Sequence, residues 1–260
     1  MSETEFNLIR SVGFVLALGL AAGLQRWRPH ARFDRPWASN VGLWAINLVV
    51  IGVVCGGCAC AVARWAAAAE VGLLNAVSAP LWLGVPATVL ALDFVSYVWH
   101  RANHRIRWLW RFHQVHHSDA AFTVSTGVRF HPGELLLSLP IRLAAVVALG
   151  PSPVAVVAFE VVFTVANLVE HGNIDLPLAV ERRIDRLCIT PALHRRHHSR
   201  HRRELNTNFG TLFAWWDRLL GTYAGSSSDA RIETGLAELP GTPGIGRALI
   251  LPMRLYAPRG

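Results

Sequence analysis

Long apolar runs separated by arginine-rich segments most restrict how this 260-residue chain can fold. A helix needs about 20 mostly apolar residues to cross a bilayer, and residues 6–24 and 41–63 form runs of that kind. A third run ends at Trp99 and begins at either Val71 or Leu81. Charged residues make up only 16% of the chain, which is low for a soluble domain. We therefore expect a membrane-embedded protein that retains its first run, because that run lacks the basic start and cleavage site of a signal peptide.

Two shorter apolar segments, 134–149 and 154–169, flank the sequence Gly150-Pro151-Ser152-Pro153. Glycine and proline mark turns, so this pattern predicts a helical hairpin. Each arm has only about 16 residues, which leaves open whether the hairpin crosses the bilayer or re-enters it. The expected fold is an all-α integral membrane bundle of three spans plus this hairpin, with a cytoplasmic histidine-rich helical cap.

The same pattern divides the chain into three regions. Residues 1–92 hold the N-terminal spans, and residues 93–224, which include the hairpin 134–170, hold most of the histidines. Residues 225–260 form a tail whose apolar part, 245–256, is a candidate for lying along the membrane interface.

Arginine supplies all 25 basic residues and gives a net charge of +8. The arginines gather in segments 26–35, 101–129 and 182–203 and in the tail, and only Arg10, Arg64 and Arg142 fall elsewhere. The positive-inside rule places these segments in the cytoplasm and the N-terminus outside. Topology and anionic lipid headgroups thus explain the basic balance, and no nucleic-acid partner is expected.

Eight of the 12 histidines fall into three tight clusters: His100 and His104; His113, His116 and His117; His194, His197 and His198. Residues three or four apart share a helix face, so each cluster can present two or three imidazoles to a metal. Eight imidazoles exceed the positions around a single transition metal, which implies two metals. The clusters contain no cysteine, and Arg101 stands where a zinc protease motif has glutamate.

Three boxes of the form H-x3-H, H-x2-H-H and H-x2-H-H, in this order around membrane spans, resemble the fatty acid hydroxylase/sterol desaturase superfamily. The flanking segments 93–97, 110–118 and 208–223 are also similar to that family. The second box resembles bacterial members and alkylglycerol monooxygenases most closely. The resemblance covers residues 92–223 and implies a non-haem di-iron centre, with zinc as a substitute metal. Such a centre would use O2 to hydroxylate or desaturate a lipid C–H position at the cytoplasmic face of a bacterial inner membrane.

The resemblance also implies roles for individual residues. The eight box histidines would be metal ligands, His171 a ninth, and Asn167 could hold a metal-bound water. Ligating imidazoles need partners on their other ring nitrogen. We expect Asp93, which lies two turns before His100, and Glu170 to supply such partners or to lie close behind the ligands. The same is expected of His131. The other nearby carboxylates are Asp119, Glu134, Asp185 and Asp217. His201, among arginines, is expected to face solvent.

Activation of O2 needs two electrons from outside this chain. The sequence has no Rossmann glycine pattern, haem-attachment motif or iron–sulfur cysteine set, so a separate ferredoxin, cytochrome or reductase is expected. The alternatives are a di-zinc membrane hydrolase and a non-enzymatic haem or metal carrier. A haem carrier would place single histidines on facing spans, and a transporter would place its ligands within them. The lipid substrate stays open among acyl chains, sterols, ether lipids and carotenoids.

Overall fold

A computed structural model describes residues 1–32, 37–55, 58–225 and 232–254, and these residues form helices and isolated β-bridges but no strands. Five stretches are long and apolar enough to cross a membrane: α1 (Glu3–Trp27), Trp37–Ala76, α5 (Leu81–Arg105), α7 (Pro132–Leu149) and α8 (Pro153–Glu170). The second stretch contains α2 (Trp37–Cys55), α3 (Cys58–Ala68) and α4 (Leu73–Ala76). The expected all-helical membrane bundle is confirmed.

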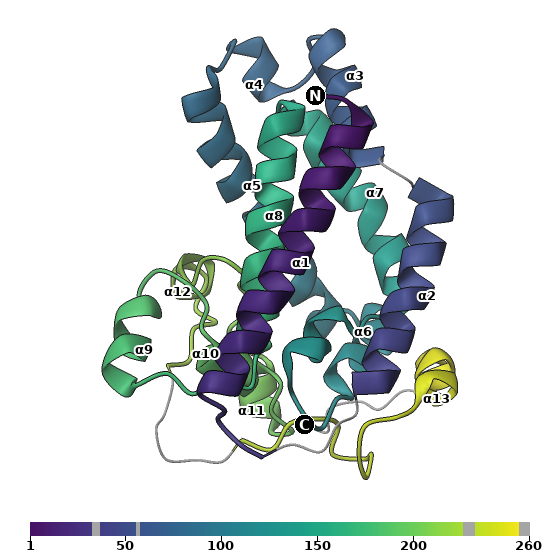
Figure 1. Cartoon of the computed structure of the whole chain (residues 1–260), viewed down its shortest axis with the longest axis vertical. Coiled ribbons are helices and arrows are strands. Elements are labelled where there is room, and N and C mark those ends of the chain that lie inside the picture. The colour runs from purple at the N-terminus through teal and green to yellow at the C-terminus, as the bar shows by residue number, and fades with distance from the viewer. Residues whose placement is uncertain (33–36, 56–57, 226–231, 255–260) are drawn as a thin grey trace.

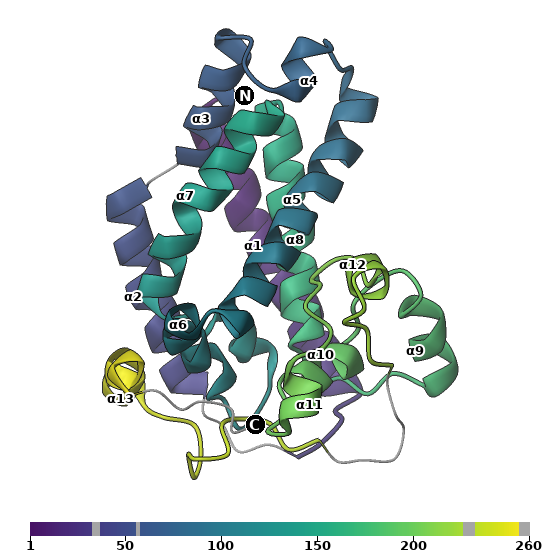
Figure 2. The same cartoon turned by 180° about the vertical axis from the view of Figure 1, so that it is seen from behind.

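The long helices run side by side along the length of the molecule (Figures 1 and 2). Helix α8 packs against both α1 and α5, and buried Phe6, Val156 and Phe159 belong to one apolar core cluster. The third span begins at Leu81, the later of its two expected starts, and Pro80 occupies the N-cap position in an extended conformation. The second expected span, 41–63, is covered by α2 and α3, apart from residues 56 and 57, which lie outside the described residues.

The expected hairpin is present as α7 and α8, and Gly150 forms the turn in a left-handed conformation with φ of 64°. A Cβ atom at Gly150 would collide with the backbone of Val71 and Gly72, so only glycine fits here. The turn therefore lies against the connection between α3 and α4, at the N-terminal end of the bundle. Each arm of 18 residues is about 27 Å long, close to the thickness of a bilayer core.

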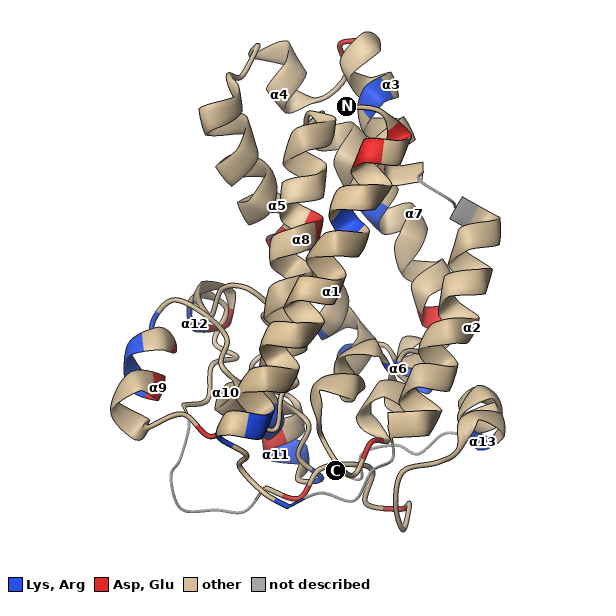
Figure 3. Cartoon of the chain, viewed as in Figure 1, with Lys and Arg blue, Asp and Glu red and all other residues tan. Residues whose placement is uncertain are grey.

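The opposite end of the bundle carries short elements that we call the cap (residues 106–131 and 171–225). They are α6 (Arg107–His117), η1 (Val124–Val128), α9 (Leu178–Ile184), α10 (Pro191–His197), α11 (Arg202–Leu205) and α12 (Trp215–Leu219). Figure 3 shows that many basic residues gather around this end. The described parts of the arginine-rich segments expected to share one membrane face thus lie at one end of the molecule.

The tail folds back onto the cap through α13 (Ile245–Ile250) and η2 (Leu251–Met253). Ala248 and Leu251 are buried in a cluster with Leu43 of α2 and Val115 of α6. The Gln114 side chain donates to the carbonyls of Leu251 and Arg254. The expected interfacial segment is therefore partly packed against protein, and residues 255 and 256 of it lie outside the described residues.

Candidate metal centre

Nine histidines converge where the bundle meets the cap. His100 and His104 project from the last two turns of α5, and the second box ends α6 at His117. His171 is the C-cap of α8, and the third box lies on α10 and its C-cap. All eight box histidines and His171 are thereby brought together from four places in the chain.

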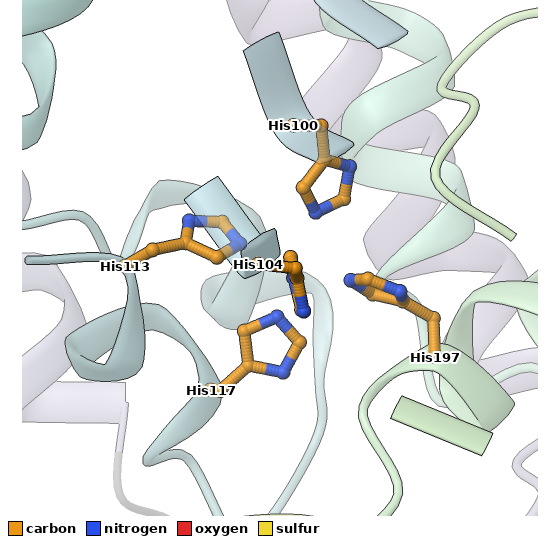
Figure 4. A group of neighbouring side chains, drawn as sticks. All are labelled: His100, His104, His113, His117 and His197. Atoms are coloured by element: carbon orange, nitrogen blue, oxygen red, sulfur yellow. The ribbon is translucent and has the colours of Figure 1, made fainter. Parts of the chain in front are cut away.

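The nine side chains form two groups, and within each group one potential ligand atom per residue lies within 4.8 Å of the others. The five-histidine group is His100, His104, His113, His117 and His197, and the four-histidine group is His116, His171, His194 and His198. Figure 4 shows the rings of the five-histidine group around a common centre. Adjacent residues such as His116 and His117 serve different groups, because successive side chains on a helix point about 100° apart.

The nitrogen atoms in these groups fit two metal ions. Among the described residues, the buried Nε2 atoms of His100, His104, His113 and His197 have no hydrogen-bond partner, nor does either ring nitrogen of His117 and His198. In the four-histidine group, the Nε2 atom of His171 lies 3.1 Å from that of His116 and 2.9 Å from that of His194. Buried polar atoms are rarely left unpaired in folded proteins. Convergent imidazole nitrogens are a donor set suited to iron, zinc or copper.

The Nδ1 atoms on the outer side of five rings are held by acceptors. His100, His116, His171 and His197 face the backbone carbonyls of Phe209, Arg129, Asn167 and Thr207 at 2.9, 3.2, 2.7 and 2.7 Å. His113 faces the Glu134 carboxylate at 2.8 Å. An Nδ1–H that donates to such an acceptor fixes the tautomer in which Nε2 carries the free lone pair. The fold therefore orients these rings for ligation.

The predicted carboxylate partners fall in different places. Glu170 lies 3.7 Å from Nδ1 of His194 and 3.8 Å from Nδ1 of His171, directly behind the four-histidine group. Asp93 instead accepts hydrogen bonds from the backbone of Leu212 and Phe213 and from the Trp216 indole. Two turns of helix separate it from His100 by about 10 Å, which is beyond the reach of a short aspartate side chain.

The side chains of three other residues marked by the sequence make contacts of a different kind. His131 caps α7, where its Nδ1 accepts from the Gly133 backbone and its Nε2 faces the Leu249 carbonyl, so it lies further out than expected. The Asn167 side chain donates to the Gly127 carbonyl at 2.8 Å. His201 is exposed, as the sequence predicts.

Sequence reasoning did not single out several residues that contact the histidines. Glu134 was only one of several nearby carboxylates, and the fold selects it as the partner of His113. The Phe130 ring stacks on His116 at 4.5 Å, and Phe209 and Phe122 lie 5.1 and 5.0 Å from His104 and His198. These aromatic rings pack directly against the histidines, and no periodic signal in the sequence marks them.

Burial sets the protonation state of six histidines of the cap. It lowers the pKa of His171 to about 4 and that of His197 to about 3. It lowers the pKa values of His116, His117, His194 and His198 well below the usual range, and neighbouring histidines lower them further. These imidazoles are therefore neutral at pH 7, as metal ligation requires.

Comparison with known proteins agrees with this geometry. Residues 85–222, more than half of the chain, match the family described as "Fatty acid hydroxylase". The chain belongs to the fatty acid hydroxylase family. The matched range contains all nine histidines of the two groups, and the resemblance stated from the histidine boxes is confirmed.

Curated relatives in the same superfamily modify lipids, according to their names. The chain is 33% identical over 163 residues to ornithine lipid hydroxylase OlsE of Rhizobium tropici, which covers 60% of this chain and 46% of the relative. It is 28% identical over 144 residues to human cholesterol 25-hydroxylase, covering 55% and 52%. It is 29% identical over 135 residues to human alkylglycerol monooxygenase, covering 52% and 29%. The chain thus spans about half or less of these relatives' length, and no solved structure matches it.

Proposed function

We propose that this chain is a membrane-bound di-iron enzyme that uses O2 to hydroxylate a C–H position of a lipid. The observation that carries the proposal is the division of nine histidines, seven of them buried, into a group of five and a group of four. Membership of the fatty acid hydroxylase family favours iron over the zinc that the same nitrogens would also bind. The names of the relatives favour hydroxylation over desaturation.

Two iron ions held by these groups would supply the activation of O2. The chain's own residues hold the imidazoles neutral and correctly turned, through carbonyl acceptors and through Glu134. Phe122, Phe130 and Phe209 keep water away from the centre. Exclusion of water matters because an oxidant that attacks an alkyl chain would otherwise be lost to side reactions.

Hydroxylation of a C–H bond places one oxygen atom of O2 in the product and reduces the other to water. That balance consumes two electrons and two protons in addition to O2. A ferredoxin, cytochrome or reductase outside this chain would deliver the electrons. The arginine distribution supports a metal centre on the cytoplasmic side of a bacterial inner membrane, where such a donor has access.

The substrate class follows from the setting of the site. The cap joins five stretches long and apolar enough to cross a membrane, so an acyl or sterol chain could approach from the bilayer. Ornithine lipid, cholesterol and alkylglycerol, the compounds in the relatives' names, are all amphiphiles with a long apolar part. We propose a membrane amphiphile of this kind as the substrate.

Lipid mass spectrometry tests the proposal. Cells that produce the wild-type chain are compared with cells that produce His116→Ala, with His201→Ala as the matched control. The expected result is a lipid that gains one oxygen atom, derived from ¹⁸O2, in the wild type and His201→Ala only. A loss of two hydrogen atoms instead would identify desaturation. Identical lipids, with metal bound by the wild type and lost from His116→Ala, would contradict lipid oxidation.

A further inference from the structure

Two short helices of the cap, and the residues that directly follow them, carry large apolar side chains that are at least 37% exposed. Figures 1 and 2 show α9 and α12 outside the bundle, beside its lower half. The most exposed of these side chains is Leu219, at 74%. We call the set the apolar face, and it consists of Leu178, Val180, Ile184, Leu187, Trp215, Leu219 and Leu220. Exposed apolar residues gathered in this way mark a contact with something other than water.

The two helices form one structural unit. The Ala214 backbone donates to the Leu187 carbonyl at 3.0 Å, and the Ile189 backbone donates to the Leu212 carbonyl at 3.1 Å. Asp185 accepts from the Tyr223 hydroxyl at 2.9 Å and pairs with Arg218. Whatever covers α12 is therefore close to α9 as well.

The unit also packs against the outer side of a membrane span. Leu90, Phe94 and Val98 are spaced by four residues on one side of α5 and are 36%, 39% and 47% exposed. The Phe94 ring lies 4.9 Å from the Trp216 ring of α12, and the Trp216 indole donates to Asp93. Trp216 thus joins α12, which carries part of the apolar face, to the exposed apolar stripe of α5.

The position along α5 sets the depth of α12. Phe94 lies three turns before the end of α5 at Arg105, or about 16 Å along the helix. The whole helix of 25 residues is about 37 Å long and exceeds a bilayer core of about 30 Å by only a few ångströms at each end. A side chain that packs on Phe94 therefore lies at the depth of the acyl chains.

The charges beside the apolar face favour lipid over protein as its partner. Arg182, Arg183 and Arg186 are exposed next to Ile184 and Leu187. This pairing of cations with apolar residues is typical of helices that lie in an anionic membrane surface. A soluble electron carrier could not reach a side chain at the depth of Phe94.

We infer that the unit of α9 and α12 is inserted into the membrane leaflet on the metal-centre side, with its apolar face against acyl chains and the α9 arginines at the phosphates. This inference goes beyond the proposed oxygenase activity and does not depend on it. An inserted α12 would link the lipid to the metal centre, because Asp217 of α12 accepts hydrogen bonds from the backbone of Phe209 and Gly210. The Phe209 carbonyl in turn holds His100.

Photocrosslinking tests the insertion in the full-length chain. p-Benzoylphenylalanine replaces Leu219 in one variant and Leu187, three residues after the end of α9, in a second. The chains are reconstituted in nanodiscs of phosphatidylcholine and phosphatidylglycerol. Replacement of Val49, 66% exposed on α2, serves as the lipid-facing reference, and replacement of exposed Arg203 on α11 as the water-facing reference. All four positions are exposed or solvent-facing, so the larger side chain displaces no core residue.

Irradiation followed by mass spectrometry gives the outcome. We expect the yield of lipid adducts at Leu219 and at Leu187 to be within about threefold of the yield at Val49. The yield at Arg203 is expected to be at least about tenfold lower than that at Val49. Lipid adducts at Val49 but not at Leu219 or Leu187 would overturn the inference. Crosslinks from Leu219 to a second copy of the chain would also overturn it.

Discussion

His197 and His201 are four residues apart and yet have opposite environments. His197 is fully buried within the five-histidine group, whereas His201 is exposed. On a continuous helix the two would share a face. Helix α10 ends at His197, so the chain turns and directs His201 outward. The end of a short helix thus separates a candidate ligand from a surface residue of the same type.

This contrast gives a matched pair of variants for metal binding. His197→Ala removes one member of the five-histidine group. Loss of a residue that only hydrogen-bonds to a metal ligand typically weakens metal binding about 10- to 100-fold, and we expect His197→Ala to weaken it by more than that. His201→Ala is expected to leave metal content unchanged. Elemental analysis of the two purified proteins checks this. Equal metal content in both variants would contradict the assignment of His197.

Variants of Glu134 test whether the orientation of the His113 ring matters for metal binding. Its carboxylate accepts from Nδ1 of His113 at 2.8 Å. We expect Glu134→Ala to weaken metal affinity about 10- to 100-fold, and Glu134→Gln to weaken it less because an acceptor oxygen remains. Competition with a chelator measures both affinities. A loss in Glu134→Gln as large as that in Glu134→Ala would argue against a role through this hydrogen bond.

At the scale of elements, Arg129 joins segments that are distant in sequence. Its buried guanidinium donates to the Val115 carbonyl and the Ser118 hydroxyl at the end of α6, and to Asn40 on α2. It also donates to the Pro243 carbonyl of the tail. Its own carbonyl faces His116. One side chain therefore fixes the end of the second histidine box against α2 and the tail.

Loss of this side chain would leave several buried acceptors unpaired. A hydrogen bond to a charged group contributes about 1.5–3 kcal/mol, so we expect Arg129→Ala to lower the unfolding free energy by at least about 3 kcal/mol. Exposed Arg203→Ala is the control and is expected to change it by less than about 0.5 kcal/mol. Thermal unfolding of the detergent-solubilised proteins compares the two. Coincident unfolding curves would show that the Arg129 contacts contribute little.

The elements themselves could be predicted, but their contacts could not. Apolar runs mark the spans, and the Gly150-Pro151 turn marks the hairpin, because both signals are local. The choice of Glu134 as the partner of His113 depends on where α7 begins relative to α6. The real role of Asp93, which holds the loop around Leu212, depends on a segment more than a hundred residues away. Pairings of this kind are set by tertiary packing.

At the scale of the whole molecule, the same packing creates the two groups. The sequence predicts two metals from the number of imidazoles, but their division into five and four becomes visible only when four segments meet. The arginine pattern predicts that the cap-side segments share one end of the molecule, and their described residues do (Figure 3).

Collective burial of the histidines predicts how the metal-free protein responds to pH. The folded-state pKa values of His171 and His197, about 4 and 3, lie below the ordinary value of 6.5. Between the ordinary pKa and these folded-state pKa values, the unfolded chain binds more protons than the folded chain. The free energy of unfolding therefore falls as pH drops below about 6.5. Denaturant unfolding of chelator-treated protein across this range checks the sign. Stability that rises on acidification would contradict this expectation.

The content of iron per chain tests the central claim most directly. The protein is produced with ample iron, purified in detergent without chelator, and analysed for metals and protein in the same sample. Two groups of ligands predict about two iron ions per chain at saturation. A single metal ion per chain, no bound metal, or zinc in both positions of a fully active protein would contradict the account.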